Sequence, residues 1–184
     1  MDGAEECSRI IQAARSGDLA AFEALMRRHE RQVLATALRL LGDMADAQDA
    51  SQEVFLRVYR NLGKLERTDA FTGWLYKVTV NACRDLRRKR PSAAPVEEVG
   101  ELISGAADPL EAAGQTERRR ALDLSLRMLP ERERAAVVLR DLEGLSTKEV
   151  ARAMGSSEAT VRSQISQARA KMKSFLERYF RRRL

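Results

Sequence analysis

Residues 146–163 read STKEVARAMGSSEATVRS, and this stretch decides which kind of fold the chain adopts. Ser146, followed three residues later by Glu149, forms a capping box that begins a helix. The helix ends at Gly155, because glycine readily takes the left-handed backbone conformation that closes a helix. The serines at 156–157 then cap a second helix. Two short helices joined by a tight glycine turn predict a helix-turn-helix.

The second helix of this motif carries side chains that suit the edges of DNA bases. A helix fits the major groove of duplex DNA, where hydroxyl, amide and guanidinium groups can bond to bases. The candidate base-contacting residues are Ser157, Thr160, Arg162, Ser163, Ser166 and Gln167. The candidate phosphate-contacting residues are Lys148, Arg152, Arg169 and Lys171, which add affinity without reading sequence. A plain helical hairpin with a polar outer face is the alternative.

Apolar residues at helical spacing continue along the rest of the chain. Helices are predicted over 19–41, 43–62 and 70–90, with Asp18 and Asp69 as N-caps of the first and third. Pro109 and Pro130 begin two more helices before the motif. Aromatic residues make up 5% of the chain, and glycine and proline are scarce, which disfavours turn-rich sheets. The predicted fold class is all-α.

Charge is distributed unevenly along the chain. Residues 1–90 hold 16 basic and 13 acidic side chains, residues 91–117 hold none and six, and residues 118–184 hold 17 and eight. The acidic segment has too few apolar side chains to fold alone. We therefore expect two small helical domains, 1–90 and 118–184, joined over 91–117 by a flexible acidic linker and the start of the next helix. Basic modules of this kind attract nucleic acid.

Several classes of protein are disfavoured by what the sequence contains. Cys7 and Cys83 lie far apart without a CxxC pattern, so neither a disulfide framework nor a zinc site is expected. The first residues are acidic, and the longest unbroken apolar run is 135–139. We therefore expect no secretion signal, no membrane span, no metal and no cofactor, and an intracellular, cytoplasmic protein. Whether either cysteine is redox-active stays open.

Three groups of residues follow one another in a recognisable order. Residues 46–59 read DAQDASQEVFLRVY, and residues 71–85 read FTGWLYKVTVNACRD. Leu129-Pro130 is followed by EGLS at 143–146, EVA at 149–151 and TVRS at 160–163. Together they resemble bacterial RNA polymerase sigma factors of the sigma-70 family, extracytoplasmic-function (ECF) type. The resemblance covers about residues 10 to 178, and three motifs in order are far more specific than one.

The resemblance implies a function for each domain. The chain would bind core RNA polymerase, through the clamp coiled coil and the flap, and direct promoter-specific initiation without being an enzyme. Residues 1–90 would act as sigma region 2, which docks on polymerase and recognises and melts the minus-10 element. Residues 118–184 would act as region 4, which recognises the minus-35 element. The linker, with Glu97, Glu98 and Glu101, would thread a basic RNA channel, and an anti-sigma factor is a further expected partner.

Four residues form the candidate polymerase-docking face: Asp46, Asp49, Gln52 and Glu53. Their spacing of three and four residues places them on one side of a helix, and a face of this charge needs a basic counterpart. In sigma factors that counterpart is the coiled coil of the largest catalytic polymerase subunit. A merely solvated face is one alternative. A carboxylate metal site is another, although the single histidine, His29, lies far away in the sequence.

The candidate minus-10 residues are Asn81, Lys77, Arg84, Arg88, Lys64 and Arg67. An amide flanked by cations suits a base edge beside phosphates. The resemblance implies that Asn81 contacts the minus-10 element and that the loop 63–68 holds an extruded base. No aromatic residue lies in this loop, so stacking there is unsupported. Trp74 shares a helix side with Phe71 and is expected in the core.

The sequence departs from similar sigma factors in its last helix. Gln164 and Gln167 stand where similar factors commonly carry arginine, so the minus-35 sequence that this chain recognises cannot be inferred from the resemblance.

Two other functions compete with the sigma-factor interpretation. One rival is a free-standing helix-turn-helix regulator that binds an operator as a dimer and senses a signal through residues 1–90. The other is a carboxylate-metal enzyme acting on nucleic acid, which would require divalent-dependent turnover.

Overall fold

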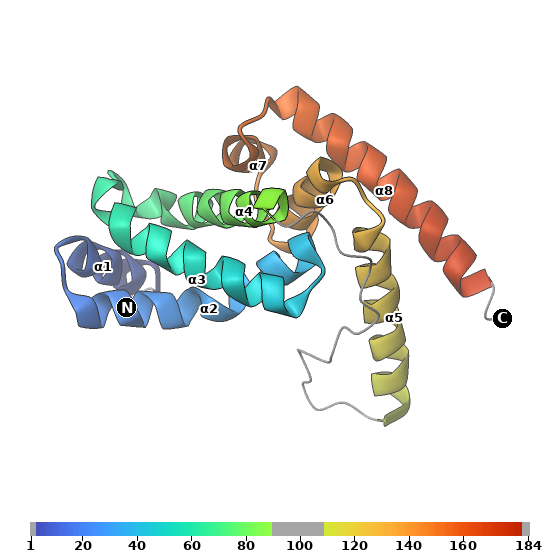
Figure 1. The fold of residues 1–184 in the computed structure, drawn as a ribbon, viewed down its shortest axis with the longest axis horizontal. Coiled ribbons are helices and arrows are strands. Elements are labelled where there is room, and N and C mark those ends of the chain that lie inside the picture. The colour runs from blue at the N-terminus through green and yellow to red at the C-terminus, as the bar shows by residue number, and fades with distance from the viewer. Residues whose placement is uncertain (1–2, 90–108, 182–184) are drawn as a thin grey trace.

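The computed structural model describes residues 3–89 and 109–181, and within these ranges it consists of helices and their connections, with no strand (Figure 1). The α-helices are α1 (Gly3–Arg15), α2 (Leu19–Leu41), α3 (Met44–Asn61), α4 (Phe71–Lys89), α5 (Pro109–Arg127), α6 (Glu131–Val137), α7 (Thr147–Met154) and α8 (Glu158–Arg181). Shorter helical turns are η1 (Leu62–Lys64), η2 (Thr68–Ala70) and the π-helical η3 (Val138–Leu142). The all-α prediction is confirmed. The linker carboxylates Glu97, Glu98 and Glu101 lie outside the described residues.

Most predicted helix ends are confirmed. The Asp18 carboxylate accepts a hydrogen bond from the Ala21 amide at 3.0 Å and so caps α2. Gly42 ends that helix with a φ of 82°, a conformation that favours glycine. The prediction that Asp69 is the N-cap of the third predicted helix is wrong. Asp69 lies in η2 and accepts a hydrogen bond from Arg67 Nε at 3.0 Å, because the chain tightens into a 3-10 turn before α4 begins.

Helices α1 to α4 enclose an apolar core of their own. Its fully buried members include Leu25 of α2, Val54 and Val58 of α3, and Phe71 of α4. Helix α1 was not among the predicted helices, and it adds Ile11, which is 2% exposed. The amino-terminal half is therefore a four-helix unit within the described residues, rather than the three-helix unit that the sequence predicted.

A second apolar core is shared between the two halves of the chain, which pack directly on each other. Ala37 of α2, Tyr76 and Val80 of α4, and Val150 and Ala153 of α7 belong to the same buried cluster. Helix α7, the first helix of the helix-turn-helix, lies against α4 (Figure 1). The sequence predicted two domains joined by a linker but gave no sign of this contact.

Glu143, at the end of η3, joins the two halves through hydrogen bonds. Its side chain is 6% exposed. It accepts hydrogen bonds from Thr36 Oγ1, Arg39 and the Tyr76 hydroxyl, each at 2.8 Å. Burial and the neighbouring Glu143 carboxylate raise the pKa of Tyr76, which keeps its hydroxyl protonated as a donor. We call these four residues the Glu143 clasp.

Arg134 of α6 forms a second polar link between the halves. It is 6% exposed and donates to the Leu40 carbonyl of α2 at 2.9 Å. It also donates to the carbonyls of Arg127 and Leu129, at 2.6 and 3.0 Å. Burial lowers the pKa of Arg134 to about 10, because a charge is costly to remove from water. The guanidinium thus satisfies carbonyls where α2 and α5 end.

His29 makes the stability of the amino-terminal half depend on pH. It is the only histidine in the chain, and its ring lies 5.3 Å from that of Phe71 in the core. Burial lowers the pKa of His29 below its ordinary value of 6.5. The unfolded chain then binds the proton more readily, so the free energy of unfolding is highest at pH values well above 6.5 and falls as the pH drops through 6.5 towards the lowered pKa.

We therefore expect the free energy of unfolding to fall between pH 7.5 and 5.5, with a slope of at most about 1.4 kcal/mol per pH unit, the limit for one proton. Urea unfolding at several pH values measures the slope. His29→Leu should remove this dependence while keeping an apolar side chain against Phe71. An equal slope in the variant would assign the pH dependence to another group.

Candidate nucleic-acid interface

The helix-turn-helix is formed by α7 and α8, as the sequence predicted. The hydroxyl of Ser146 and the carboxylate of Glu149 form the reciprocal capping box at the start of α7. Gly155, with a φ of 61°, makes the turn, and the Ser157 hydroxyl accepts the Thr160 amide at 3.1 Å. Inside the motif, α8 buries Val161, Ile165 and Ala168.

The predicted base-contacting residues all lie at exposed positions at the start and in the first half of α8: Ser157, Thr160, Arg162, Ser163, Ser166 and Gln167. Their polar groups make only local contacts, such as that of Gln167 Nε2 with Ser163 Oγ at 3.4 Å. Gln164 differs from these residues, because it is half-buried and its Oε1 is enclosed by protein atoms. Of these two glutamines, Gln167 is therefore the exposed one.

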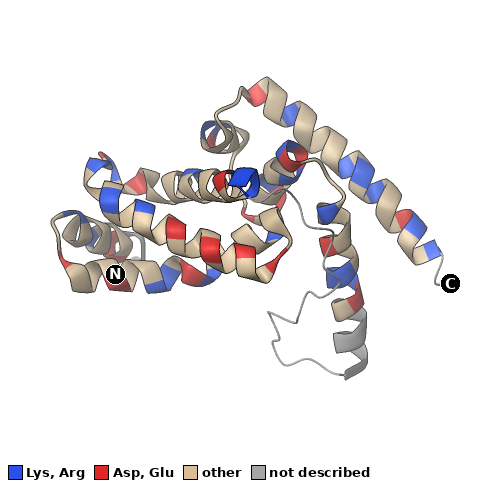
Figure 2. Cartoon of the chain, in the orientation of Figure 1, with Lys and Arg blue, Asp and Glu red and all other residues tan. Residues whose placement is uncertain are grey.

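The four predicted phosphate-contacting residues fall into two pairs. Lys148 and Arg152 are exposed on α7. Arg169 donates to both oxygens of Asp141, at 2.9 and 2.6 Å, and Lys171 donates to both oxygens of the buried Glu133, at 2.6 and 2.8 Å. These two cations hold α8 against α6 and η3, so a phosphate would have to compete with a carboxylate for each of them. In Figure 2, most of the charged segments of α8 are blue.

The predicted minus-10 residues lie on α4 and on the loop before it. Lys77, Arg84 and Arg88 are exposed, and Arg84 donates to Asn81 Oδ1 at 3.0 Å. A pocket of about 500 Å³ brings Asn81 together with Lys64 and Arg67. The sequence had predicted these three residues for one role, and the structure places them around one cavity.

Other residues that line the pocket were not predicted for this site from the sequence. Trp74 is half-buried, with its ring centroid 6.1 Å from that of Phe71, and it also lines the pocket. It is therefore not only a core residue, as predicted, because its position on α4 borders the loop. Arg57 and Asn61 of α3 line the pocket as well. The i, i+4 spacing of Glu53 and Arg57 was the available signal for Arg57.

The four predicted docking residues lie together on α3. Asp49 and Gln52 are exposed, and Asp46 and Glu53 are half-buried. Red segments recur along α3 in Figure 2. The Glu53 carboxylate accepts a hydrogen bond from Arg57 Nε at 2.6 Å, which raises the pKa of Arg57. The docking face is thus tied to a cation of its own helix.

Three other features that the sequence analysis raised are a metal site, a redox-active cysteine and a membrane-spanning helix. Among residues 3–89 and 109–181, no group of three or more histidine, cysteine or acidic side chains is arranged to hold a metal ion. Burial raises the pKa of the Cys83 thiol to about 12, so this thiol is protonated at neutral pH. In the same ranges, no helix has the length and apolar character needed to cross a membrane.

The fold and the surfaces place the chain in the class of two-part helical DNA-binding proteins. One part contains the helix-turn-helix, and the other contains a basic helix beside a pocket. Residues 25–92 match the family model for sigma-70 region 2, and residues 119–172 match that for sigma-70 region 4.

Curated relatives agree with these two matches. The chain is 36% identical to the ECF RNA polymerase sigma factor SigM of Mycobacterium tuberculosis, over 92% of this chain and 84% of SigM. It is 31% identical to the RNA polymerase sigma-H factor of Pseudomonas aeruginosa, over 90% and 91% of the two chains. The chain belongs to the ECF sigma factors of the sigma-70 family. It binds core RNA polymerase and directs promoter-specific transcription initiation, contacting DNA through both domains.

Solved structures share the fold. The structure of CnrH in complex with the cytosolic domain of CnrY superposes with a TM-score of 0.67 at 28% identity, over 93% of this chain and 97% of CnrH. The sigma factor RpoE of Bartonella quintana gives a TM-score of 0.71 at 20% identity, over 85% and 96% of the two chains. The second likeness concerns the fold alone.

Proposed function

We propose that residues 1–90 act as region 2, which docks on polymerase and captures the opened minus-10 element, and that residues 118–184 act as region 4, which holds the duplex minus-35 element. Residues 91–117 connect them. The observation that best supports this division is the pocket beside α4, which is lined by an amide, two cations and an indole: Asn81, Lys64, Arg67 and Trp74. These groups suit a single nucleotide of an opened strand.

The chemistry of the pocket matches the demands of base extrusion. Taking a base out of the duplex costs a few kcal/mol, which stacking and hydrogen bonds must offset. Trp74 supplies the aromatic surface that the loop 63–68 lacks, and Asn81 supplies both a donor and an acceptor. Lys64 and Arg67 are exposed at the rim, where they attract the flanking phosphates.

The second domain reads duplex DNA by inserting the start of α8 into the major groove. Thr160, Ser163 and Gln167 meet base edges there, and Lys148 and Arg152 contact phosphates. Because Gln167 is the exposed one of the two glutamines, it sets a minus-35 preference different from that of factors with arginine at this position.

The chain acts as an adaptor and performs no chemistry itself. Asp46, Asp49, Gln52 and Glu53 grip the clamp coiled coil of polymerase, and the second domain meets the flap. Polymerase transfers the nucleotides, so the chain is no enzyme and needs no cofactor. It works in the cytoplasm beside polymerase, and the acidic linker occupies the RNA channel. CnrH, a structural neighbour, forms a complex with the cytosolic domain of CnrY. We propose that the present chain likewise binds a protein partner, namely the anti-sigma factor that the sequence resemblance implies.

Run-off transcription with purified core polymerase, over a library randomised in both promoter elements, tests this proposal. We expect chain-dependent transcripts enriched at two elements. Asn81→Ala should weaken selection at the downstream element, and Gln167→Ala at the upstream element, each by roughly tenfold, the value of one good base contact. Gln12→Ala, an exposed change on α1, serves as the control. Transcripts that do not depend on the chain, or variants that alter the wrong element, would contradict the assignment.

A further inference from the structure

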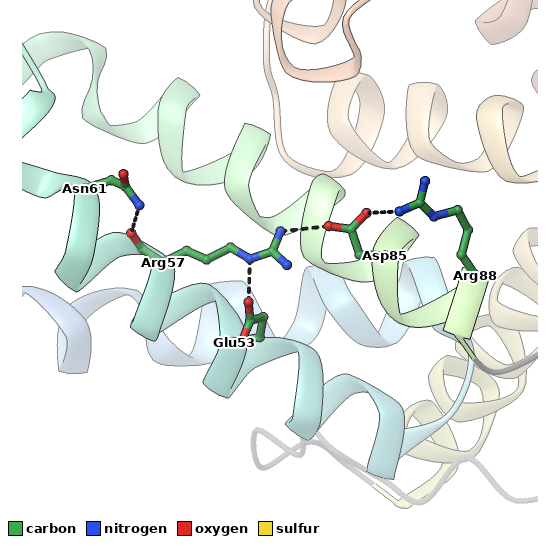
Figure 3. A network of polar contacts seen from close by, with 5 residues as sticks. All are labelled: Glu53, Arg57, Asn61, Asp85 and Arg88. Carbon is green, nitrogen blue, oxygen red and sulfur yellow. Dashed lines mark hydrogen bonds and ion pairs between the residues drawn. The ribbon is translucent and has the colours of Figure 1, made fainter.

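Arg57 connects the helix of the docking face to the helix of the minus-10 face (Figure 3). Its Nε donates to Glu53 of α3 at 2.6 Å, and its terminal nitrogen donates to Asp85 of α4 at 3.0 Å. Asp85 in turn accepts Arg88 at 3.3 Å. Carboxylates and guanidinium groups thus alternate along one line. Asn61 donates to the Arg57 carbonyl at 2.9 Å, one turn further along α3.

The two ends of this line belong to different proposed surfaces. Glu53, with 42% of its side chain exposed, is a docking residue, and Arg88, with 76% exposed, is a minus-10 residue. Arg57 and Asp85, each 28% exposed, lie between them. The Asp85–Arg88 contact is the longest of the three ion pairs, so it is the one most easily exchanged for another partner.

We propose that Arg57 is a positioning residue that couples polymerase docking to promoter binding. A polymerase cation that binds Glu53 competes with Arg57 for the carboxylate. The guanidinium of Arg57 then turns both arms of its fork to Asp85, a geometry that arginine and carboxylate favour. Arg88 loses its share of Asp85 and is released to a DNA phosphate. This inference rests on the docking and minus-10 roles proposed above.

The coupling can be measured from either side, because linkage between two binding sites is reciprocal. A fluorescently labelled full-length chain is titrated with core polymerase, with and without a fork DNA from a promoter selected in the run-off assay. This DNA has a duplex upstream element and a single-stranded minus-10 non-template strand. The ratio of the two dissociation constants is the coupling factor, and a general loss of stability cancels from it.

The unchanged chain should show a coupling factor on the order of tenfold, within the usual range for coupled sites. Arg57→Lys should lower it to about twofold, because lysine is a compact charge that cannot bridge two carboxylates with a fork. Arg60→Lys is the matched control, because Arg60 is an exposed arginine on the same helix, and it should leave the factor unchanged.

Asp85→Asn gives a second and opposite signature. An amide holds Arg88 weakly, so the chain alone should bind the fork DNA more tightly, and core polymerase should add little. Asp69→Asn is the matched control, because it also removes a carboxylate charge that pairs with a predicted minus-10 arginine, Arg67. Asp69 has no ion pair with Arg57 in this line of residues. The Asp69→Asn variant should therefore bind DNA more tightly while its coupling factor stays equal to that of the unchanged chain.

An Arg57→Lys coupling factor equal to that of the unchanged chain would overturn the inference, while the proposed docking and minus-10 roles would stand. Equal coupling factors for Asp85→Asn and Asp69→Asn would overturn it as well. If the unchanged chain failed to bind core polymerase, or gained nothing from the DNA, the proposed function itself would fail together with the inference.

Discussion

Asp49→Lys will lower the affinity of the chain for core polymerase by on the order of a hundredfold, because on the proposed docking face it places a cation opposite the cations expected of the polymerase clamp, and like charges at an interface cost several kcal/mol. Asp49 is exposed at the centre of the predicted docking face. The loss should appear in the titration of labelled chain with core polymerase. It should shrink as salt is added, since salt screens exposed charges.

Glu23→Lys is the matched control for this change. Glu23 is exposed on α2 and pairs with Arg27 at 3.0 Å, so the variant makes the same change in net charge away from α3. Its affinity for core polymerase should stay within about twofold of that of the unchanged chain, as expected for a surface charge outside the interface. Equal losses in both variants would indicate a general effect of net charge and would remove the docking assignment.

Glu143→Ala will destabilise the contact between the two halves by about 2 to 4 kcal/mol, because the buried hydroxyls of Thr36 and Tyr76 lose their acceptor and an unpaired buried polar group costs about 1 to 3 kcal/mol. The change leaves Thr36, Arg39 and Tyr76 without the acceptor that each contacts at 2.8 Å. Urea unfolding should show the loss, and small-angle X-ray scattering should show a larger radius of gyration as the halves separate.

Two other variants make the Glu143 result specific. Glu143→Gln keeps one oxygen, which can accept from either Thr36 or Tyr76 but not from both, and it loses the charge facing Arg39, so its stability should fall between that of the wild type and that of Glu143→Ala. Glu177→Ala breaks only an exposed pair with Lys173 at 4.0 Å and should cost less than about 1 kcal/mol. An unchanged radius of gyration and an unchanged unfolding midpoint in Glu143→Ala would show that the clasp does not hold the halves together.

The parts of the fold that depend on residues close together in the sequence were predictable. Asp18, Gly42 and Gly155 act through the backbone within a few positions, so each helix end could be read directly. The exposed face of α8 could be predicted in the same way, because burial of Val161 and Ile165 fixes which side of the helix remains outside.

The contact between the halves could not be predicted in this way. Glu143 and Thr36 are separated by 107 positions, and each alone resembles an ordinary polar residue on a helix. The pocket could not be predicted for a similar reason. Trp74 belongs to the apolar stripe of α4, and it lines a pocket only because the loop before α4 packs beside it. Arg57 was missed because its second partner, Asp85, lies on another helix.

The most direct test of the adaptor role is a gel shift of promoter DNA with the purified chain, in the presence and absence of core polymerase. We expect a stable, promoter-specific complex only when both proteins are present, with one chain per polymerase. Tight binding by the chain alone, as a dimer on two-fold half-sites, would instead identify a free-standing regulator and contradict the adaptor role.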